Sequence, residues 1–283
     1  MKARAWWLAG VVAGCVAGGA ALAADPHEDE RAATEASQQG DFGTAVRLLT
    51  GALAAPGLSA EERAELTLHR AFAYDEDGQY DRAIADYTQV IAQKPDASQV
   101  YFRRGISRRE KGEYEQALAD FDVAMGESAP EVPFVYGDRG VVRFALGRFA
   151  EAARDFAHVV ALDPTDQYAV LWLHVARSRA GRTDGEEFAH DAAESASQVW
   201  PRPLVALYLG DGSPQWVRDA AAEGDTEAHQ NKECEADFFL GEYALLRGQA
   251  DTAKPLFRSV VESCSPSLGV HAGAAGELKR LGG

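Results

Sequence analysis

Apolar, small and polar positions recur in the same order along the chain. The segments 80–95, 114–125 and 149–164 read "YDRAIADYTQVIAQKP", "YEQALADFDVAM" and "FAEAARDFAHVVALDP". Counted from Gly78, Gly112 and Gly147, an aromatic residue follows after two positions, an alanine after five and a second aromatic after nine, and a small residue stands seven positions earlier. These glycines are 34 and 35 residues apart, and a period of that length predicts a solenoid of stacked units.

The pattern resembles the tetratricopeptide repeat (TPR), in which two antiparallel helices are joined by a tight turn. This resemblance implies an all-α, TPR-type superhelical solenoid, with the small residues where helix backbones approach each other and the aromatic residues between neighbouring hairpins. Three repeats fill residues 64–164. Weaker matches imply a degenerate N-terminal repeat at 27–56, a degenerate helical region at 165–225, and a C-terminal TPR-like hairpin with a capping helix at 226–283.

Each strong copy also carries an arginine and an aspartate at mirrored positions. The arginine lies eight residues before the turn glycine and the aspartate eight residues after it. A hairpin folded at the glycine therefore brings the two side chains opposite each other. This predicts three structural ion pairs: Arg70 with Asp86, Arg104 with Asp120, and Arg139 with Asp155. The alternative is a row of arginines that binds an anionic ligand.

In the TPR family, residues of each first helix that do not pack internally line a concave surface. Carried over to this sequence, the resemblance implies a protein-binding groove made mostly of large apolar side chains, which suits an amphipathic helix or an extended apolar peptide. The positions are Leu68, Phe72 and Asp75, then Phe102, Ile106 and Arg109, then Gly137, Val141 and Phe144. The alternative is that the chain's own N-terminal or C-terminal helix fills this groove.

Composition and motifs narrow the classes of function. The net charge of −16 argues against nucleic-acid binding, which needs a basic face. The sequence lacks a phosphate-binding loop and the CxxC, HExxH and GxSxG motifs, and its seven histidines are scattered. We therefore expect no catalytic residues, no metal and no cofactor, and an enzyme on a helical scaffold is the least favoured alternative.

The first 24 residues have the pattern of an export signal. Lys2 and Arg4 precede an uncharged run that is rich in glycine, alanine and valine, and the polar chain begins at Asp25. Residues 21–23 read "ALA", which predicts a signal peptide at 1–23 and a soluble periplasmic protein. The alternative is the stretch "VAGC" at 12–15, which resembles a lipobox and would make Cys15 the lipidated residue of an outer-membrane-anchored lipoprotein.

The C-terminal half, from "WPRPLVALYLGDGSPQW" at 200–216 onward, resembles bacterial envelope repeat proteins of the NlpI type. Members of that group are outer-membrane lipoproteins that dimerise and act as adaptors between peptidoglycan hydrolases and a protease. The resemblance implies an adaptor that binds envelope proteins or peptides. A structural homodimer, with the groove used for self-assembly, is the alternative.

Two cysteines remain when Cys15 is removed or lipidated. Cys234 lies 14 residues before Gly248 and Cys264 lies 16 residues after it, so the two thiols mirror each other about a turn. Packed helix axes are about 8–10 Å apart, which lets facing side chains reach disulfide distance. In an oxidising compartment this spacing predicts a Cys234–Cys264 disulfide that pins the last hairpin. Two buried free thiols or an intermolecular bridge are the alternatives.

Overall fold

The computed structural model describes residues 26–126, 133–195 and 199–282. Over these ranges the chain forms fifteen α-helices and no strand, and consecutive helices pack as antiparallel pairs. The predicted all-α, TPR-type solenoid is confirmed. The predicted signal peptide and Cys15 lie outside the described residues.

The helices follow one another in hairpins joined by short turns. The four N-terminal pairs are α1 (Pro26–Gln38) with α2 (Phe42–Leu53), α3 (Ala60–Glu76) with α4 (Tyr80–Gln93), α5 (Ser98–Glu110) with α6 (Tyr114–Met125), and α7 (Pro133–Ala145) with α8 (Phe149–Leu162). The remaining helices are α9 (Gln167–Arg179), α10 (Gly185–Glu194), α11 (Arg202–Leu209), α12 (Pro214–Ala221), α13 (Thr226–Leu246), α14 (Ala250–Ser263) and α15 (Gly269–Arg280).

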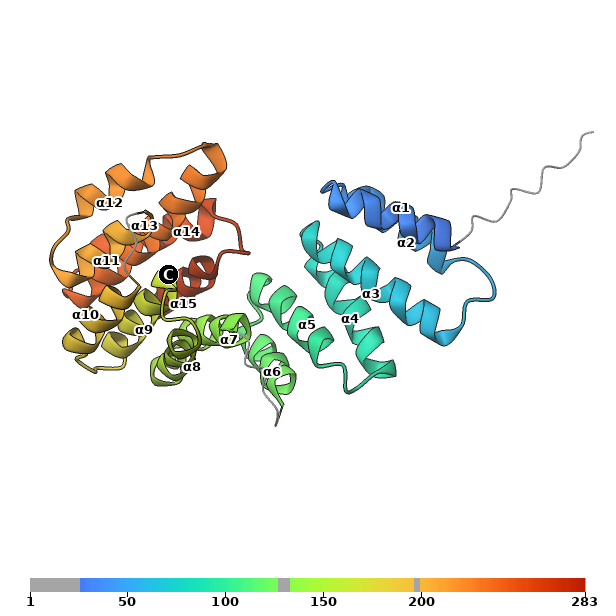
Figure 1. Ribbon diagram of the computed structural model, residues 1–283, viewed down its shortest axis with the longest axis horizontal. Helices are drawn as coiled ribbons and strands as arrows, with labels where there is room; N and C mark the ends of the chain where they lie inside the picture. The colour runs from blue at the N-terminus through green and yellow to red at the C-terminus, as the bar shows by residue number, and fades with distance from the viewer. Residues whose placement is uncertain (1–25, 127–132, 196–198, 283) are drawn as a thin grey trace, which may run out of the picture.

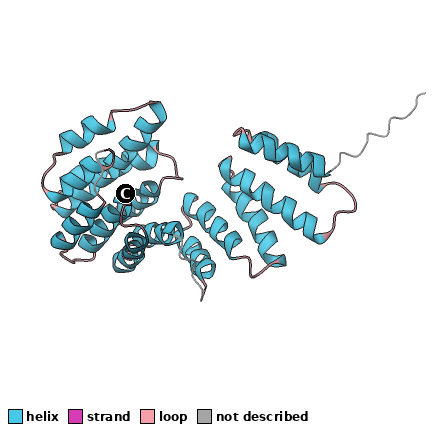
Figure 2. Cartoon of the chain, in the orientation of Figure 1, coloured by secondary structure: helices cyan, strands magenta, loops and turns pink. Residues whose placement is uncertain are grey.

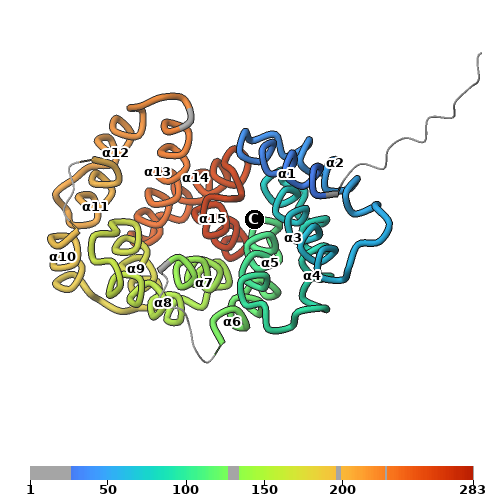
Figure 3. Tube along the Cα trace, turned by 45° about the vertical axis from the view of Figure 1, so that its right-hand side comes forward, coloured from blue at the N-terminus to red at the C-terminus, as the bar shows by residue number. Residues whose placement is uncertain are grey.

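The hairpins follow an arc whose two ends bend toward each other (Figure 1). Helices α5 and α7 lie on the inner side of the arc, with α6 and α8 on its outer side (Figures 1 and 2). The C-terminal helices turn back toward the middle of the chain, so that α15 packs against α7 (Figure 3). This return of the chain decides how much of the inner surface stays open.

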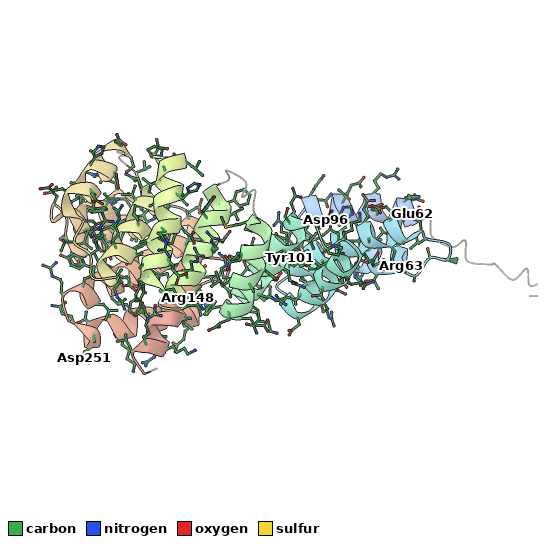
Figure 4. The ribbon with its side chains drawn as sticks, turned by 90° about the horizontal axis from the view of Figure 1, so that it is seen from below. Glu62, Arg63, Asp96, Tyr101, Arg148 and Asp251 are labelled. Atoms are coloured by element: carbon green, nitrogen blue, oxygen red, sulfur yellow. A yellow bond between two sulfur atoms is a disulfide. The ribbon has the colours of Figure 1, made fainter. Side chains whose placement is uncertain are left out.

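Local sequence explains where the helices begin and how closely they pair. At the start of α3, the Ser59 hydroxyl accepts a hydrogen bond from the Glu62 amide, and the Glu62 carboxylate (Figure 4) accepts one from the Ser59 amide. Within the α5–α6 hairpin, Gly105 faces the Phe121 ring, and a Cβ at this glycine would lie 2.7 Å from that ring. The small residue seven positions before the turn is therefore where the aromatic side chain of the second helix packs.

The three arginine–aspartate pairs are present in the structure. In each pair the guanidinium Nε and Nη2 donate to the two carboxylate oxygens of the aspartate, at 2.7–3.1 Å. Such two-point contacts are stronger than a single charged hydrogen bond. The aspartate side chains are almost fully buried, and each pair links the two helices of its hairpin.

The same arginines also connect each hairpin to the preceding one. The Nη1 atom of Arg104 donates to the Thr88 hydroxyl at 3.0 Å, and that of Arg139 donates to the Asp122 carboxylate at 3.0 Å. All three guanidinium nitrogens of Arg104 and of Arg139 thus have partners within the chain. This arrangement favours structural ion pairs over a row of arginines that binds an anionic ligand.

A buried charged cluster attaches α15 to the rest of the C-terminal half. The Arg179 guanidinium of α9 donates to Glu242 of α13 at 2.8 Å and lies 2.7 Å from a carboxylate oxygen of Glu277 of α15. Arg280 pairs with Glu277 at 2.6 Å and donates to the Ala145 carbonyl at 2.8 Å. Gly276 makes this docking possible, because a Cβ there would lie 2.7 Å from the Cα of Ala145.

The predicted Cys234–Cys264 disulfide is present, with a Cα–Cα distance of 5.9 Å. It joins Cys234 of α13 to Cys264, the residue that follows α14, at the open end of that hairpin. The segment that follows Cys264 leads directly into α15, so the bridge also anchors the start of this connection. One of its residues, Ser267, accepts a hydrogen bond through its carbonyl from Arg109 of α5 at 3.1 Å.

None of the helices in the described ranges combines the length and the apolar character that crossing a bilayer requires.

Candidate functional site

The inner surface of the third strong repeat is covered by the chain itself. Phe144 is 0% exposed and Val141 is 6% exposed, and both belong to the core that contains α13 and α15. Gly269 of α15 packs on the Val141 side chain. The prediction that Val141 and Phe144 line an open groove is therefore wrong. The C-terminal helix α15 packs on α7 and fills this part of the surface. This is the alternative in which the chain's own terminal helix occupies the groove.

Arg109 is also buried rather than free to meet a partner, at 7% exposure. Its guanidinium lies 2.6 Å from the Asp138 carboxylate and 3.0 Å from that of Glu110, and it also donates to the Ser267 carbonyl. This side chain therefore connects α5 to α7 and to the segment before α15. The prediction that Arg109 contacts a partner directly is wrong, because internal acceptors surround it.

Of the other six predicted groove positions, four large apolar side chains remain half-buried on the inner surface, while Asp75 is buried and Gly137 is half-buried on α7. Leu68 and Phe72 come from α3, and Phe102 and Ile106 come from α5. Phe134 at the start of α7 extends this surface, since its ring lies 5.3 Å from that of Phe102 and is 57% exposed. We call these five side chains the concave strip. Phe134 was not predicted, because it precedes the register positions that the repeat defines.

Hollows flank the concave strip on two sides. One cavity of about 320 Å³ is walled by α1 and α3 and includes Phe72 and His69. Another of about 300 Å³ lies between α5 and α7 and includes Phe102 and Phe134. Cavities of this size between half-buried aromatic rings can each receive an apolar side chain of a bound segment.

A larger cleft of about 650 Å³ opens at the end of the strip, where α3, α5 and α7 meet the segment before α15. We call it the acidic cleft, because five of its lining residues are carboxylates. Its charged residues are Asp75, Glu76, Asp77, Glu110, Asp138, Arg103 and Arg109. Ser265 and Ser267, which follow the disulfide, close its far wall.

Burial raises the pKa of three of the five carboxylates of the acidic cleft. Burial raises the pKa of Asp75 to about 7, against the hydrogen bond from the Ser107 hydroxyl, and the nearby Glu110 carboxylate adds to the rise. Burial likewise raises the pKa of Glu110 and of Asp138, although the Arg109 charge opposes both shifts. Together these carboxylates form a site where added positive charge is favoured.

Asp75→Asn is expected to stabilise the protein at pH 8 by about 1–3 kcal/mol and to give no gain at pH 4. The folded-state pKa of Asp75 is about 7, above the unfolded value of 3.8, so wild-type stability falls as the pH rises through this window. Asparagine stays neutral and still accepts from Ser107. Urea unfolding of both proteins at the two pH values measures the effect. A difference between them that does not change with pH would contradict the prediction.

The sequence predicts some of the residues that line this cleft. Asp75 and Arg109 each lie three residues before their turn glycine, and both were assigned to the inner surface. Glu110 and Asp138 were missed, because they occupy unrelated positions in their repeats. They come together with the segment at 265–267 because α5 packs against α7 and Arg109 contacts Glu110, Asp138 and the Ser267 carbonyl.

One further group of side chains could coordinate a cation. Oxygen or nitrogen atoms of Glu30, Glu65 and His69 lie within 4.8 Å of one another between α1 and α3. The His69 Nδ1 atom is already 3.0 Å from the Glu30 carboxylate. Because His69 and Glu65 are exposed, the geometry is accounted for by a surface ion pair.

Comparison with known proteins supports the repeat assignment. The family model for the tetratricopeptide repeat matches residues 68–133, which include the second half of α3 and all of α4, α5 and α6. At sequence identities of 13–16% the structural similarities below establish the fold alone.

Three solved structures illustrate the similarity. A tetratricopeptide repeat protein from Parabacteroides merdae has a TM-score of 0.61 and 15% identity, over 89% of this chain and 98% of that one. MamA from Desulfovibrio magneticus has a TM-score of 0.53 and 16% identity, over 60% and 92% of the two chains. The C-terminal part of a TPR repeat-containing protein from Cytophaga hutchinsonii has a TM-score of 0.52 and 13% identity, over 88% and 87%.

Proposed function

We propose that the protein is an exported scaffold that binds other cell-envelope proteins through the concave strip and has no catalytic activity of its own. The observation that carries the proposal is the strip itself. Its aromatic and aliphatic side chains are half-buried between cavities on the inner surface, instead of packing fully into a core. A peptide or helix that covered them would bury apolar surface, which is the main driving force for association.

Two features support a role outside the cytoplasm. Residues 1–24 have the composition and cleavage pattern of an export signal. The Cys234–Cys264 disulfide is of the kind that persists in oxidising compartments such as the periplasm. The proposed location is the periplasm, and anchoring through a lipid on Cys15 remains the alternative. The resemblance to envelope proteins of the NlpI type adds the expectation of an adaptor that brings two other proteins together.

Phe102→Asp is expected to abolish capture of the partner and to leave the helical content unchanged. A carboxylate in the middle of the strip would have to be desolvated when the partner binds, which opposes association. The measurement is crosslinking and affinity capture from the native envelope, with circular dichroism on the purified variant. A loss of about tenfold or more in the captured partner is expected.

Val123→Asp is the matched control, because Val123 is an exposed apolar residue on α6, at the outer side of the arc. Its capture profile should equal that of the wild type. Equal capture by the Phe102 variant and the wild type would overturn the proposed function.

A further inference from the structure

The residues beside the concave strip indicate the charge of the segment that binds there. The inference drawn from them rests on the proposed function. We infer that the bound segment is basic as well as apolar: its apolar side chains cover the concave strip, and a lysine or arginine of the same segment enters the acidic cleft. The groove would then select its partners by charge as well as by hydrophobicity.

The strip and the acidic cleft form one continuous surface. Ile106 belongs to the strip and also lines the cleft. Arg103 lines both the cleft and the cavity beside Phe102, and its guanidinium lies 5.3 Å from the centre of the Phe72 ring. A segment of a few residues that lies on the strip therefore reaches the cleft without leaving the inner surface.

The charges of the acidic cleft are not balanced from within the chain. Of its two arginines, Arg109 is held by Asp138 and Glu110. Asp75 accepts from the Ser107 hydroxyl, and Asp77 from the Gln79 side chain, both of which are neutral donors. In the described part of the chain, the ion pairs include none with Asp75, Glu76 or Asp77. The second arginine, Arg103, lowers the pKa of Asp75 by its charge, so five carboxylates face two arginines in the cleft.

A buried hydroxyl distinguishes the repeat that borders the acidic cleft. The Tyr87 side chain is fully buried, and its hydroxyl has no hydrogen-bond partner among the described residues. Burial raises the pKa of Tyr87, the charges of Asp75, Glu76 and Glu110 raise it further and that of Arg103 lowers it, and these four residues line the cleft. Phenylalanine fills the same register position in the next two repeats, at Phe121 and Phe156, so packing does not require the hydroxyl. The hydroxyl therefore leaves a buried hydrogen-bonding group unsatisfied close to the charged residues of the cleft, as expected of a site that a polar ligand completes.

The electrostatics of the acidic cleft oppose an acidic segment and favour a basic segment over a neutral one. The pKa values of Asp75, Glu110 and Asp138 are raised mainly by burial, and for Asp75 and Glu110 neighbouring carboxylates add to the rise. A guanidinium or ammonium group lowers the free-energy cost of ionising these carboxylates, an acidic side chain raises it, and an uncharged one leaves it unchanged. Like-charge juxtaposition would therefore reject acidic segments from the groove.

The test uses a random library of 12-residue peptides, selected on the exported chain in the presence of EDTA so that no divalent cation competes. We expect the selected peptides to combine leucine or aromatic residues with at least one arginine or lysine. For a selected peptide, replacing that basic residue by glutamine should weaken binding about tenfold, and replacing it by glutamate should weaken it further.

Variants of the protein distinguish a contact in the acidic cleft from the effect of the overall charge of the chain. Glu76 is exposed at the end of α3, so Glu76→Lys should leave the fold intact and weaken binding of the arginine peptide about tenfold. The same variant should bind the glutamate analogue better than the wild type does. Glu115→Lys makes the same charge change on α6, outside the cleft, and should bind like the wild type.

The outcomes also separate this inference from the proposed function. Selected peptides that carry no basic residue, or that bind the Glu76 and Glu115 variants equally, overturn the inference. If those peptides still lose binding to Phe102→Asp, the proposed function stands. If no selected peptide depends on Phe102 or on Glu76, the inference is overturned, and envelope capture by the Phe102 variant then decides the proposed function by itself.

Discussion

Phe144→Asp is expected to destabilise the protein by at least about 4–5 kcal/mol and to unfold its C-terminal half. The Phe144 ring is fully buried and lies 4.9, 5.1 and 6.1 Å from the rings of Phe149, Trp172 and Phe238. The substitution loses the burial of an aromatic side chain and places a charge in an apolar site. Since whole domains are stable by only about 5–15 kcal/mol, this loss approaches the total.

Urea unfolding followed by circular dichroism and tryptophan fluorescence measures this effect, because Trp172 lies in the affected core. Phe102→Asp is the comparison, since Phe102 is only half-buried and its variant should keep most of the wild-type stability. A Phe144 variant with a wild-type midpoint would show that α15 does not cover α7 in solution. The open groove would then extend into the third repeat.

Arg179→Met is expected to cost about 3–5 kcal/mol above pH 8, where Glu242 is ionised in the wild type. Arg179 is the basic partner of Glu242, which is fully buried, and it shares Glu277 with Arg280. Its guanidinium also lies 4.7 Å from the centre of the Phe149 ring. Methionine keeps much of the side-chain volume but leaves a buried carboxyl without its counter-charge.

The cost of Arg179→Met should grow as the pH rises. Burial raises the pKa of Glu242 to about 8, and the adjacent Glu277 carboxylate raises it further while Arg179 lowers it. Without Arg179 the carboxyl remains protonated to higher pH, so its ionisation costs more free energy in the alkaline range. Unfolding of the variant and the wild type at pH 6 and pH 9 measures this difference.

Glu242→Gln added to Arg179→Met is the control, because the amide cannot ionise. The double variant should recover part of the stability that the single variant loses, most clearly at pH 9. A single variant that matches the wild type at both pH values would contradict the role of this cluster. The cluster would then contribute nothing to holding α15 on α9 and α13.

The position of α15 shortens the binding surface. Without this helix the inner surface would continue over Val141 and Phe144, as the repeat register implies. With it, the open part consists of α3, α5 and the first turn of α7, and the acidic cleft lies where the segment at 265–267 closes the groove. The disulfide at Cys264 anchors that segment directly beside the cleft.

The sequence by itself determined everything that depends on one hairpin. The turn glycines, the small residue under each aromatic ring, the three arginine–aspartate pairs and the disulfide all involve partners 16–30 residues apart, on two helices joined by one turn. Such contacts repeat because each hairpin folds about its own glycine, so their spacing is visible in the sequence.

Only the tertiary structure decided which inner residues stay open. Ile106 and Val141 both lie six residues before their turn glycines, yet Ile106 is half-buried and Val141 is buried. The difference comes from α15, which is more than 120 residues away along the chain from Val141 and docks where Gly269 and Gly276 let the backbones approach. Repeat spacing reports contacts between neighbours, and the return of a distant helix onto one repeat leaves no periodic signal.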